Sequence, residues 1–251
     1  MAQRVLHPMK IRRLRVAKVK NLSPSLRRLS LHGDLDDFPT GLFSPGDHVR
    51  LILPGDTGQL VLPQVENDRV VRVPGIGPAR DYTPRALSAE GLVIDMLTSH
   101  NGPAARWAAA ATVGDEIGVG GPRASMLMPT DREHYVVVAD ATALPAAARW
   151  VEQAPLVARI TLLLQAPGQE RYLDEVDTSR VTSYWCSTPK QALNRLRALN
   201  LAGAFVWAAG EAHWMISIRE LLAQREVRRP DRKISGYWRL GEAGFDHHTP
   251  I

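Results

Sequence analysis

The chain has 251 residues, a formal net charge of +5 and a pI of about 9.6. Hydrophobic residues make up 45% of it and charged residues 23%, which is typical of globular proteins and not of disordered ones. A chain of this length can form two domains, each with its own core. The single cysteine, Cys186, excludes an intramolecular disulfide, a zinc knuckle and a cysteine-ligated iron–sulfur cluster. We interpret it as a core residue.

The positive net charge favours anionic partners. The first thirty residues contain nine lysines and arginines and no acid, a pattern that nucleic-acid binding can produce. Residues 10–20, however, alternate charged with aliphatic side chains and include no aromatic residue, so we interpret the run as a solvated strand face. There is no apolar stretch of about 18 residues and no apolar leader segment. We therefore expect a soluble cytoplasmic monomer with no nucleic-acid or membrane partner.

The first half of the chain, residues 1–129, has the pattern of an antiparallel β domain. Turn dipeptides separate short aliphatic segments. The expected strands are residues 11–19, 26–31, 48–53, 80–85, 92–97 and 116–119. A helix is expected over residues 103–111, where Pro103 suits the first turn. Six strands with one late helix predict a closed six-stranded β-barrel, in which residues 55–79 form a long loop.

The second half, residues 130–251, alternates continuous apolar strands with helices. The expected strands are residues 135–138, 160–164, 181–186, 204–207 and 233–238, and the expected helices are residues 142–152, 191–199 and 212–224. This alternation predicts an α/β domain with a parallel sheet covered on both faces, followed by a C-terminal tail.

One stretch of the barrel half, from Arg80 to Arg85, combines cations, an aromatic ring and a hydroxyl. In an extended strand Arg80 and Tyr82 point to one side, and Thr83 and Arg85 to the other. Pro84 removes a backbone donor, so the strand should end there or lie at an edge. A guanidinium suits a pyrophosphate, and the tyrosine ring and threonine hydroxyl suit a flat heteroaromatic ring. The alternative is an ordinary barrel strand.

Two further segments of the first half could bind an anion. Gly102-Pro103 leads directly into the expected helix, whose first-turn amides form an anion site. Gly121-Pro122-Arg123-Ala124-Ser125 has glycine for close backbone approach, and Arg123 and Ser125 could reach an anion. A plain loop-to-helix junction and an inter-domain linker are the alternatives.

In the second half, three segments follow strands at the edge where open α/β sheets bind ligands. They begin at Asp140, Trp207 and Ser235. The chain has no Gly-x-Gly-x-x-Gly fingerprint here, and Asp140 and Thr142 could alternatively cap the following helix.

Six motifs together resemble those of the siderophore-interacting proteins, in the same order and approximate spacing. They are Arg80-x-Tyr-Thr-x-Arg85, Gly102-Pro-Ala-x-x-Trp107, Gly121-Pro-Arg-x-Ser125, Asp140-x-Thr-Ala-Leu-Pro145, Trp207-Ala-Ala-Gly-Glu211 and Gly236-Tyr-Trp-Arg239. The resemblance covers nearly the whole chain, and its last two motifs are the most specific. It implies a ferredoxin-reductase-like protein, with an FAD-binding barrel in residues 1–129 and an NAD(P)H-binding domain in residues 130–251.

The resemblance also implies roles for individual residues. Those expected around the FAD are Arg80, Tyr82, Thr83, His100, Gly102, Pro103 and Ala104. Four more are expected to bind one of the two cofactors: Arg85, Trp107, Ser125 and Trp238. Those expected to face the nicotinamide nucleotide are Asp140, Thr142, Ala143, Ala209, Gly210 and Glu211. Those expected to receive an anionic ferric chelate are Arg50, Arg123 and Arg239. Arg50 stands where the family more usually has lysine, which keeps the charge but changes its reach.

The implied activity is a ferric-siderophore reductase, which passes electrons from NAD(P)H through FAD to Fe(III) and so releases Fe(II). Electron transfer of this kind requires no acid–base residue. The second apolar strand ends at Gln165 without an acid, and Arg171 follows, which favours NADPH over NADH. The alternatives are a general flavin or ferric reductase without siderophore selectivity and a non-catalytic ferric-chelate binding protein.

Overall fold

The computed structural model describes residues 3–39 and 44–245 and divides the chain into two compact units. One unit runs from Gln3 to Leu127, and the other begins at Met128. The end of the expected C-terminal tail, residues 246–251, lies outside the described residues. Among the helices that the structure describes, none is long and apolar enough to cross a membrane.

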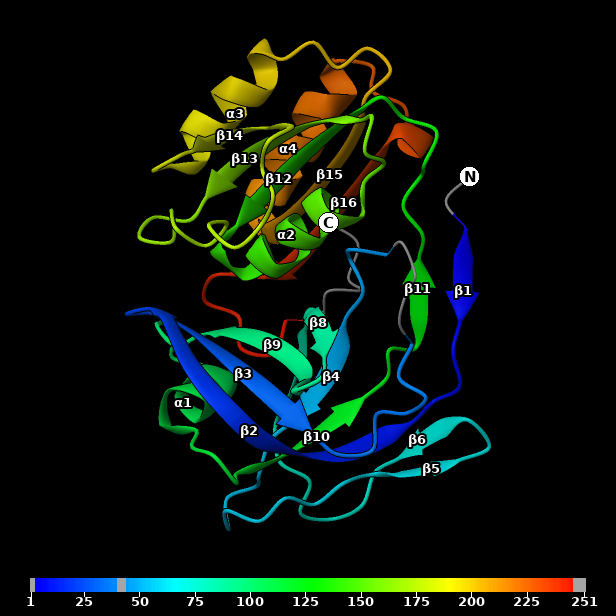
Figure 1. Cartoon of the computed structure of the whole chain (residues 1–251), viewed down its shortest axis with the longest axis vertical. Helices are drawn as coiled ribbons and strands as arrows, with labels where there is room; N and C mark the ends of the chain where they lie inside the picture. Colours follow the sequence, from blue (N-terminus) through cyan, green and yellow to red (C-terminus); the bar gives the residue numbers. More distant parts are fainter. Residues whose placement is uncertain (1–2, 40–43, 246–251) are drawn as a thin grey trace. The chain divides into compact units, whose positions relative to one another are not determined.

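The first unit is built on a seven-stranded antiparallel sheet with the order β7-β4-β10-β2-β3-β9-β8 (Figure 1). Its strands are β2 (Ile11–Ser23), β3 (Leu26–His32), β4 (Val49–Ile52), β7 (Ala79–Tyr82), β8 (Pro84–Ser88), β9 (Gly91–Leu97) and β10 (Glu116–Gly120). The two edge strands β7 and β8 are consecutive in the chain and separated only by Thr83. The sheet must therefore curl round on itself, as a barrel does. The predicted antiparallel curled sheet is confirmed, with seven strands where six were expected.

The expected single strand over residues 80–85 is wrong, because the structure has two strands there. The chain leaves one edge of the sheet after Tyr82 and joins the other edge at Pro84. Proline cannot donate to a ladder, so it is suited to the first position of an edge strand. The expectation that Pro84 marks a strand end or an edge is confirmed.

Alternate residues of the strands fill the barrel. Leu14 and Val16 of β2 and Ile117 and Val119 of β10 are buried in one core cluster. Helix α1 (Pro103–Ala110) adds Ala104 and Ala108 to the same cluster. This helix has no glycine at its carboxyl end; instead, Arg27 of β3 donates to the carbonyls of Ala108 and Ala109, at 2.6 and 2.8 Å.

Two small sheets of the first unit were not predicted. β1 (Arg4–Leu6) pairs with β11 (Ala124–Met126). β5 (Gln64–Glu66) and β6 (Arg69–Val71) form a hairpin inside residues 55–79, which were expected to be a loop. Its turn, Asn67-Asp68, has φ values of 48° and 61°, which suit the type I′ turn that joins two strands tightly.

The second unit has a five-stranded parallel sheet with the order β14-β13-β12-β15-β16. The strands are β12 (His134–Asp140), β13 (Arg159–Gln165), β14 (Val181–Trp185), β15 (Phe205–Glu211) and β16 (Arg232–Trp238). The helices are α2 (Leu144–Gln153), α3 (Pro189–Ala198) and α4 (Ala212–Gln224), with short 3-10 turns η1 (Ala141–Ala143) and η2 (Arg229–Asp231). The predicted parallel α/β domain is confirmed.

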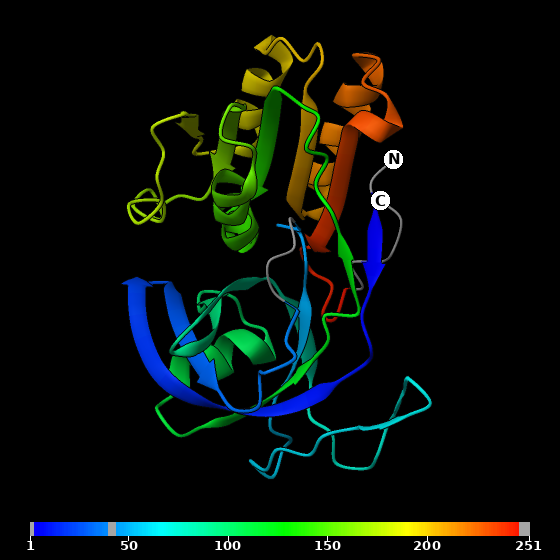
Figure 2. The ribbon, with the colours of Figure 1, turned by 45° about the vertical axis from the view of Figure 1, so that its right-hand side comes forward.

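Both faces of this sheet are covered, as its apolar strands predict. On one face, Trp150 of α2 lies 5.6 to 6.0 Å from the rings of Tyr135, Phe205 and Trp207. The opposite face packs against α3 and α4 (Figure 2): Val138 of the sheet is buried in a second core cluster with Leu196 of α3 and Ile218 of α4. Cys186 is buried in that second cluster, which confirms its interpretation as a core residue.

Arginines also close the carboxyl ends of α2 and α3. Arg180 donates to the carbonyls of Val151, Ala154, Pro155 and Ala158, at 2.6 to 3.3 Å. Arg225 donates to those of Leu196, Arg197 and Leu199, at 2.6 to 3.4 Å. The last carbonyls of a helix have no partner within the helix, so these guanidinium groups satisfy them.

Candidate functional site

The barrel strand that carries Arg80 and Tyr82 pairs with β4 in a register that fixes their direction. Arg80 is opposite Leu51, and Tyr82 is opposite Val49. Directly opposed residues of an antiparallel pair share a face, so Arg80 and Tyr82 lie on the face that Leu51 and Val49 direct into the barrel. Their expected common direction is confirmed.

Burial raises the pKa of Tyr82 to about 12, although the nearby charge of Arg80 opposes this rise. The phenol is therefore neutral at physiological pH and offers a ring and a hydroxyl. The Arg80 guanidinium donates to the Ala79 carbonyl at 2.8 Å. Both side chains are half-buried on the same strand face.

The other pair in this motif is arranged differently from the expectation. Thr83 is buried in the one-residue link between β7 and β8. Arg85 lies at an irregularity in the pairing of β8 with β9. Because alternation of faces applies only within a continuous strand, the predicted common side of Thr83 and Arg85 does not follow here.

The amino end of α1 is open. Gly102 is its N-cap and Pro103 its first residue, and no side chain caps the first-turn amides. A Cβ atom added at Gly102 would have no heavy atom within 4 Å. Ala104 is buried and its methyl group packs in the core, so it can offer an anion only its backbone.

Two further residues expected to bind a cofactor flank this end in the sequence, one before Gly102 and one at the last position of the motif. His100 is exposed, and Trp107 is half-buried and packs against the barrel core.

Arg123 and Ser125, which were both predicted to reach an anion, differ in their exposure to solvent. Arg123 is exposed and donates to Asp68 at 2.6 Å and to the His7 carbonyl at 3.3 Å. Ser125 is fully buried: its hydroxyl lies 2.5 Å from Asp47 Oδ2 and 2.8 Å from His7 Nε2. The Ser125 hydroxyl thus belongs to an internal hydrogen-bond network, which corrects the expectation that it is available to an anion.

Arg50 lies on the outer face of β4. It is opposite Asp81, and Nη1 of Arg50 lies 2.9 Å from Oδ2 of Asp81. Its side chain remains 53% exposed, so it can still reach a solvent-borne ligand.

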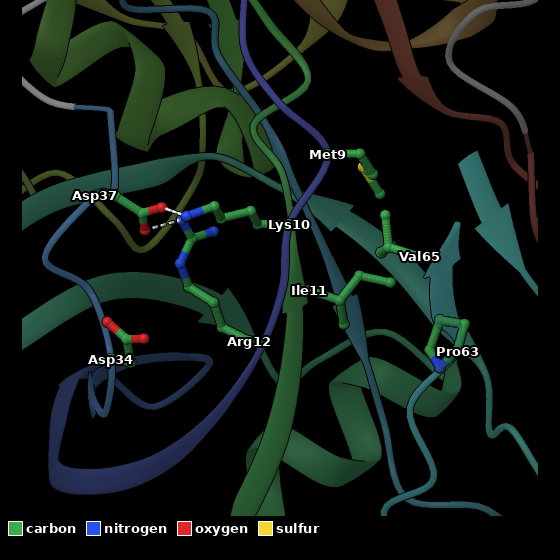
Figure 3. A pocket seen from close by; sticks show the side chains of 8 residues that line it. All are labelled: Met9, Lys10, Ile11, Arg12, Asp34, Asp37, Pro63 and Val65. Carbon is green, nitrogen blue, oxygen red and sulfur yellow. Dashed lines mark hydrogen bonds and ion pairs between the residues drawn. The ribbon is translucent and has the colours of Figure 1, made fainter. Parts of the chain in front are cut away.

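A hollow of about 350 Å³, which the sequence did not predict, lies beside the start of β2 (Figure 3). It is lined by Met9, Lys10, Ile11, Arg12, Asp34, Asp37, Pro63 and Val65. Lys10 and Arg12 both pair with Asp37, at 2.6 Å for Arg12. Burial lowers the pKa of Arg12, while the charge of Asp34 opposes this. Two basic and two acidic side chains balance, so the hollow offers an anion no net attraction.

At the carboxyl edge of the parallel sheet, Asp140 is a buried hydrogen-bond hub. Its Oδ1 accepts from the Thr142 amide at 2.8 Å and from the Thr142 hydroxyl at 2.5 Å. Its Oδ2 accepts from the Glu211 amide at 2.9 Å and from Trp238 Nε1 at 2.8 Å. Burial raises the pKa of the Asp140 carboxyl, and the four hydrogen bonds oppose that rise.

Glycine is required beside this carboxylate. Gly210 has a φ of 153°, and a Cβ atom there would lie 2.6 Å from Cγ and Oδ2 of Asp140. Ala143 and Ala209, which were expected to face a nucleotide, are both fully buried in the core. Asp140 and Thr142 thus act as a cap, the alternative that the sequence left open, and hold the sheet edge together.

Glu211 connects α4 with the segment after β16. Its carboxylate accepts from the Trp214 amide at 3.0 Å, His213 Nδ1 at 2.9 Å and the Leu240 amide at 3.2 Å. Burial raises the pKa of Glu211, but these hydrogen bonds together bring it below its usual value.

Arg239 is held between two anchored neighbours, Trp238 and Leu240. Its own guanidinium lies 3.0 Å from Glu242 and 4.7 Å from the centre of the Phe245 ring. It thereby keeps a fixed place at the end of the last strand.

The structure brings the predicted residues together in two groups. In the first unit, Arg50, Arg80 and Tyr82 lie on two paired strands. In the second, Asp140, Thr142, Gly210, Glu211, Trp238 and Arg239 lie at the carboxyl ends of three adjacent strands.

The sequence analysis missed the acids that pair with the three arginines: Asp81 for Arg50, Asp68 for Arg123 and Glu242 for Arg239. Of these acids, Glu242 is the one near its partner in sequence, three residues away.

Comparison with known protein families gives two consecutive matches. Residues 15–126 match the siderophore-interacting FAD-binding domain, and residues 132–241 match the siderophore-interacting protein family. The chain is 29% identical to the NADPH-dependent ferric-chelate reductase of Escherichia coli (strain K12), over 94% of this chain and 96% of that protein. It is 28% identical to the ferric vibriobactin reductase ViuB of Vibrio cholerae, over 94% and 92% of the two chains.

Comparison with solved structures agrees. A siderophore utilization protein from T. fusca superposes with a TM-score of 0.86 and 38% identity, over 98% of this chain and 100% of that chain. The ferredoxin reductase of carbazole 1,9a-dioxygenase, at 16% identity, has a TM-score of 0.65 over 92% of this chain and 68% of that chain. The fold is therefore ferredoxin-reductase-like.

Proposed function

The chain belongs to the siderophore-interacting protein family, and on that premise we propose that it is a ferric-siderophore reductase. It takes electrons from NADPH and passes them through FAD to Fe(III) in a bound siderophore. The observation that carries this conclusion is that both halves of the chain match the two parts of one family, in order, over residues 15–126 and 132–241.

The residues of the barrel unit fit an FAD. Arg80 and Tyr82 lie on one strand face, and both side chains are only half-buried. The amino end of α1 offers uncapped amides and open space at Gly102, as a pyrophosphate requires. When bound, FAD supplies the conversion of a two-electron hydride into single electrons. We assign Tyr82 and Thr83 to the flavin, and Arg80 and the start of α1 to the phosphates.

NADPH is assigned to the carboxyl edge of the parallel sheet, where such sheets bind ligands. Thr142 follows β12 and Glu211 ends β15 at this edge, and an exposed turn follows the neighbouring strand β13. Ala143 and Ala209 are buried beneath this edge, and Gly210 keeps it free of one projecting side chain. Asp140 and Trp238 act by holding this edge in shape.

The ferric chelate is assigned to Arg50, Arg123 and Arg239. Siderophores hold Fe(III) with hard, anionic oxygen donors, which a guanidinium attracts and hydrogen-bonds. The same donors hold Fe(II) more weakly because it carries less charge. The residues therefore bind and orient the substrate, and no side chain has to move a proton.

A single spectroscopic experiment tests this proposal. The purified protein, reconstituted with FAD, should show the absorbance of an oxidised flavin. NADPH added in the absence of oxygen should bleach the flavin absorbance. A ferric siderophore added next should restore that absorbance and form Fe(II). A protein that binds no FAD, or a bleached protein that a ferric siderophore leaves unchanged, contradicts the proposal.

A general ferric or flavin reductase without siderophore selectivity is the second candidate. It is favoured by one observation: each of the three arginines already has a carboxylate partner. The variant Arg239→Glu distinguishes the two functions. A siderophore reductase should lose turnover of anionic ferric chelates and keep that of small neutral acceptors, whereas a general reductase should keep both.

We also propose that the protein works as a cytoplasmic monomer without nucleic acid. NADPH is an intracellular donor, and the basic run of β2 is a strand whose charged residues alternate with core residues. Light scattering after size-exclusion chromatography tests the monomer, and fractionation of cells tests the location. A dimer mass or an extracellular protein would contradict this part of the proposal.

A further inference from the structure

The turn of the β5–β6 hairpin brings the Asp68 carboxylate against Arg123, one of the arginines assigned to the ferric chelate. Asp68 Oδ2 lies 2.6 Å from Arg123 Nη1. The other oxygen of Asp68 accepts a hydrogen bond of 2.6 Å from the Met9 amide. One side chain thus ties the tip of the hairpin both to the N-terminal segment and to the residue that would meet the substrate.

The hairpin is a separate element of the first unit. Its two strands form a sheet of their own, and all six of their residues are exposed. Figures 1 and 2 both show it standing out from the barrel sheet. A lone two-stranded hairpin is only marginally stable in water, so its position depends on the contacts that hold it.

Those contacts lie at the base and the tip. At the base, Val65 and Met9 line the same hollow beside β2 (Figure 3). At the tip, the turn at Asn67 and Asp68 presents the Asp68 carboxylate to the Met9 amide and to Arg123. The tip contact is ionic and open to solvent, whereas Met9 and Val65 are apolar side chains in the lining of one hollow.

The ion pair at the tip can be exchanged for another. The side chains of Arg123 and Asp68 are 50% and 53% exposed, and ion pairs at such exposure are weak. By contrast, Asp81, the partner of Arg50, lies in β7 directly opposite it, so the ladder of two barrel strands fixes that pair.

We propose that Asp68 is a specificity-determining residue, which sets how much negative charge a ferric chelate must carry to bind the Arg123 guanidinium in its place. The inference rests on the proposed function, in which Arg123 receives the chelate. The anionic oxygens of the chelate and the Asp68 carboxylate compete for the same guanidinium. A chelate binds there by displacing Asp68 and lifting the tip of the hairpin, and a neutral chelate gains nothing from doing so.

Two chelates of the same metal and different charge test this. A hexadentate ferric tris(catecholate) is triply negative, and a ferric tris(hydroxamate) is neutral. The FAD-loaded full chain is compared with Asp68→Asn, which keeps an acceptor for the Met9 amide but removes the charge. Glu66→Gln is the matched control, because it removes the same charge from an exposed position on the same hairpin.

Two quantities are measured: the KM of each ferric chelate with NADPH, and the Kd of the redox-inert gallium tris(catecholate) without NADPH. For Asp68→Asn we expect both to fall about fivefold for the triply negative chelate. The KM of the neutral chelate and all values for Glu66→Gln should stay near wild type. The gain should shrink at high ionic strength, since exposed charges are screened.

The inference is overturned if Asp68→Asn behaves as Glu66→Gln does, or if it binds the triply negative chelate more weakly than wild type. That second result would mean that Asp68 orients Arg123 for the substrate. Failure of the proposed function looks different: the wild type would reduce neither chelate with NADPH, while the gallium titration would still report whether Asp68 competes.

Discussion

Trp238 donates its indole N–H to the carboxylate of Asp140 at 2.8 Å, which joins the edge strand β16 to the central strand β12. Strand β15 lies between them in the sheet. The contact is possible because the residue of β15 beside the carboxylate is Gly210, which has no side chain to block it. The shape of the sheet edge assigned to NADPH therefore depends on a carboxylate, an indole and a glycine.

Gly210→Ala should destabilise the protein strongly. The new Cβ atom would lie 2.6 Å from the Asp140 carboxylate, and the φ of 153° is unfavourable for it. We expect a loss of about 2–4 kcal/mol in the free energy of unfolding, measured with urea. Gly203→Ala is the control, with a φ of 68° but no atom within 4 Å, and it should cost about 1 kcal/mol. Equal losses in the two variants would contradict the steric role of Gly210.

Arg180→Leu should destabilise the second unit through the end of α2. The variant keeps an apolar stem but removes the Arg180 donor from the carbonyls of Val151, Ala154 and Ala158. We expect a loss of about 2 kcal/mol in urea unfolding. Arg171→Leu serves as the comparison, because its ion pair with Asp174 is exposed and should contribute little. A stability of Arg180→Leu equal to that of Arg171→Leu would argue against the cap.

His134 should make the folded state less stable in mild acid. Burial first, and then the charge of Arg159, lower the pKa of His134 from 6.5 to about 4. Between these two pH values His134 is protonated in the unfolded chain but neutral in the folded chain. The free energy of unfolding therefore falls as the pH drops from about 6.5 towards 4. The slope should reach about 1.4 kcal/mol per pH unit at most.

The check is urea unfolding of the wild type and of His134→Gln at several pH values. The variant has no imidazole to protonate, so its stability should decline less over this window. Identical slopes for the two proteins would show that other groups cause the acid sensitivity.

Arg171→Glu should weaken NADPH and spare NADH. Arg171 follows the second strand of the sheet, and its side chain is 92% exposed. If it meets the 2′-phosphate, charge reversal should raise the KM for NADPH about tenfold or more. Stopped-flow flavin reduction with each nucleotide measures this. Lys233→Glu makes the same kind of charge change at the opposite edge of the sheet and should change neither KM. An unchanged preference in Arg171→Glu would exclude this role.

Much of the fold follows from patterns that the sequence displays directly. Continuous apolar strands such as β12 and β13 can only be buried on both faces, and alternating strands such as β2 can only be buried on one. The edge position of Pro84 followed in the same way from its missing donor. What the pattern could not reveal was that the chain crosses from one edge of the sheet to the other at Thr83, because closure is a property of the whole sheet.

The candidate site was predictable in position but not in the use of each side chain. The sequence placed Asp140 and Glu211 at strand ends, and they lie there. Whether the Asp140 carboxylate faces a ligand or its own domain depends on donors brought by distant segments, among them Trp238. Ser125 shows the same limit, since its burial depends on β1 and on Asp47. Asp68 was missed because strands of three exposed residues have the composition of a loop.

The arginines at the carboxyl ends of α1, α2 and α3 give part of the protein's positive charge a structural role. Arg27, Arg180 and Arg225 direct their charge to backbone carbonyls, where alanine or leucine stands in place of the glycine that often terminates a helix. Part of the excess of five positive charges is therefore architectural. Ending these three helices on glycine and removing the three arginines would lower the formal net charge from +5 to +2, so more than half of the excess positive charge serves the fold and not the attraction of an anionic substrate.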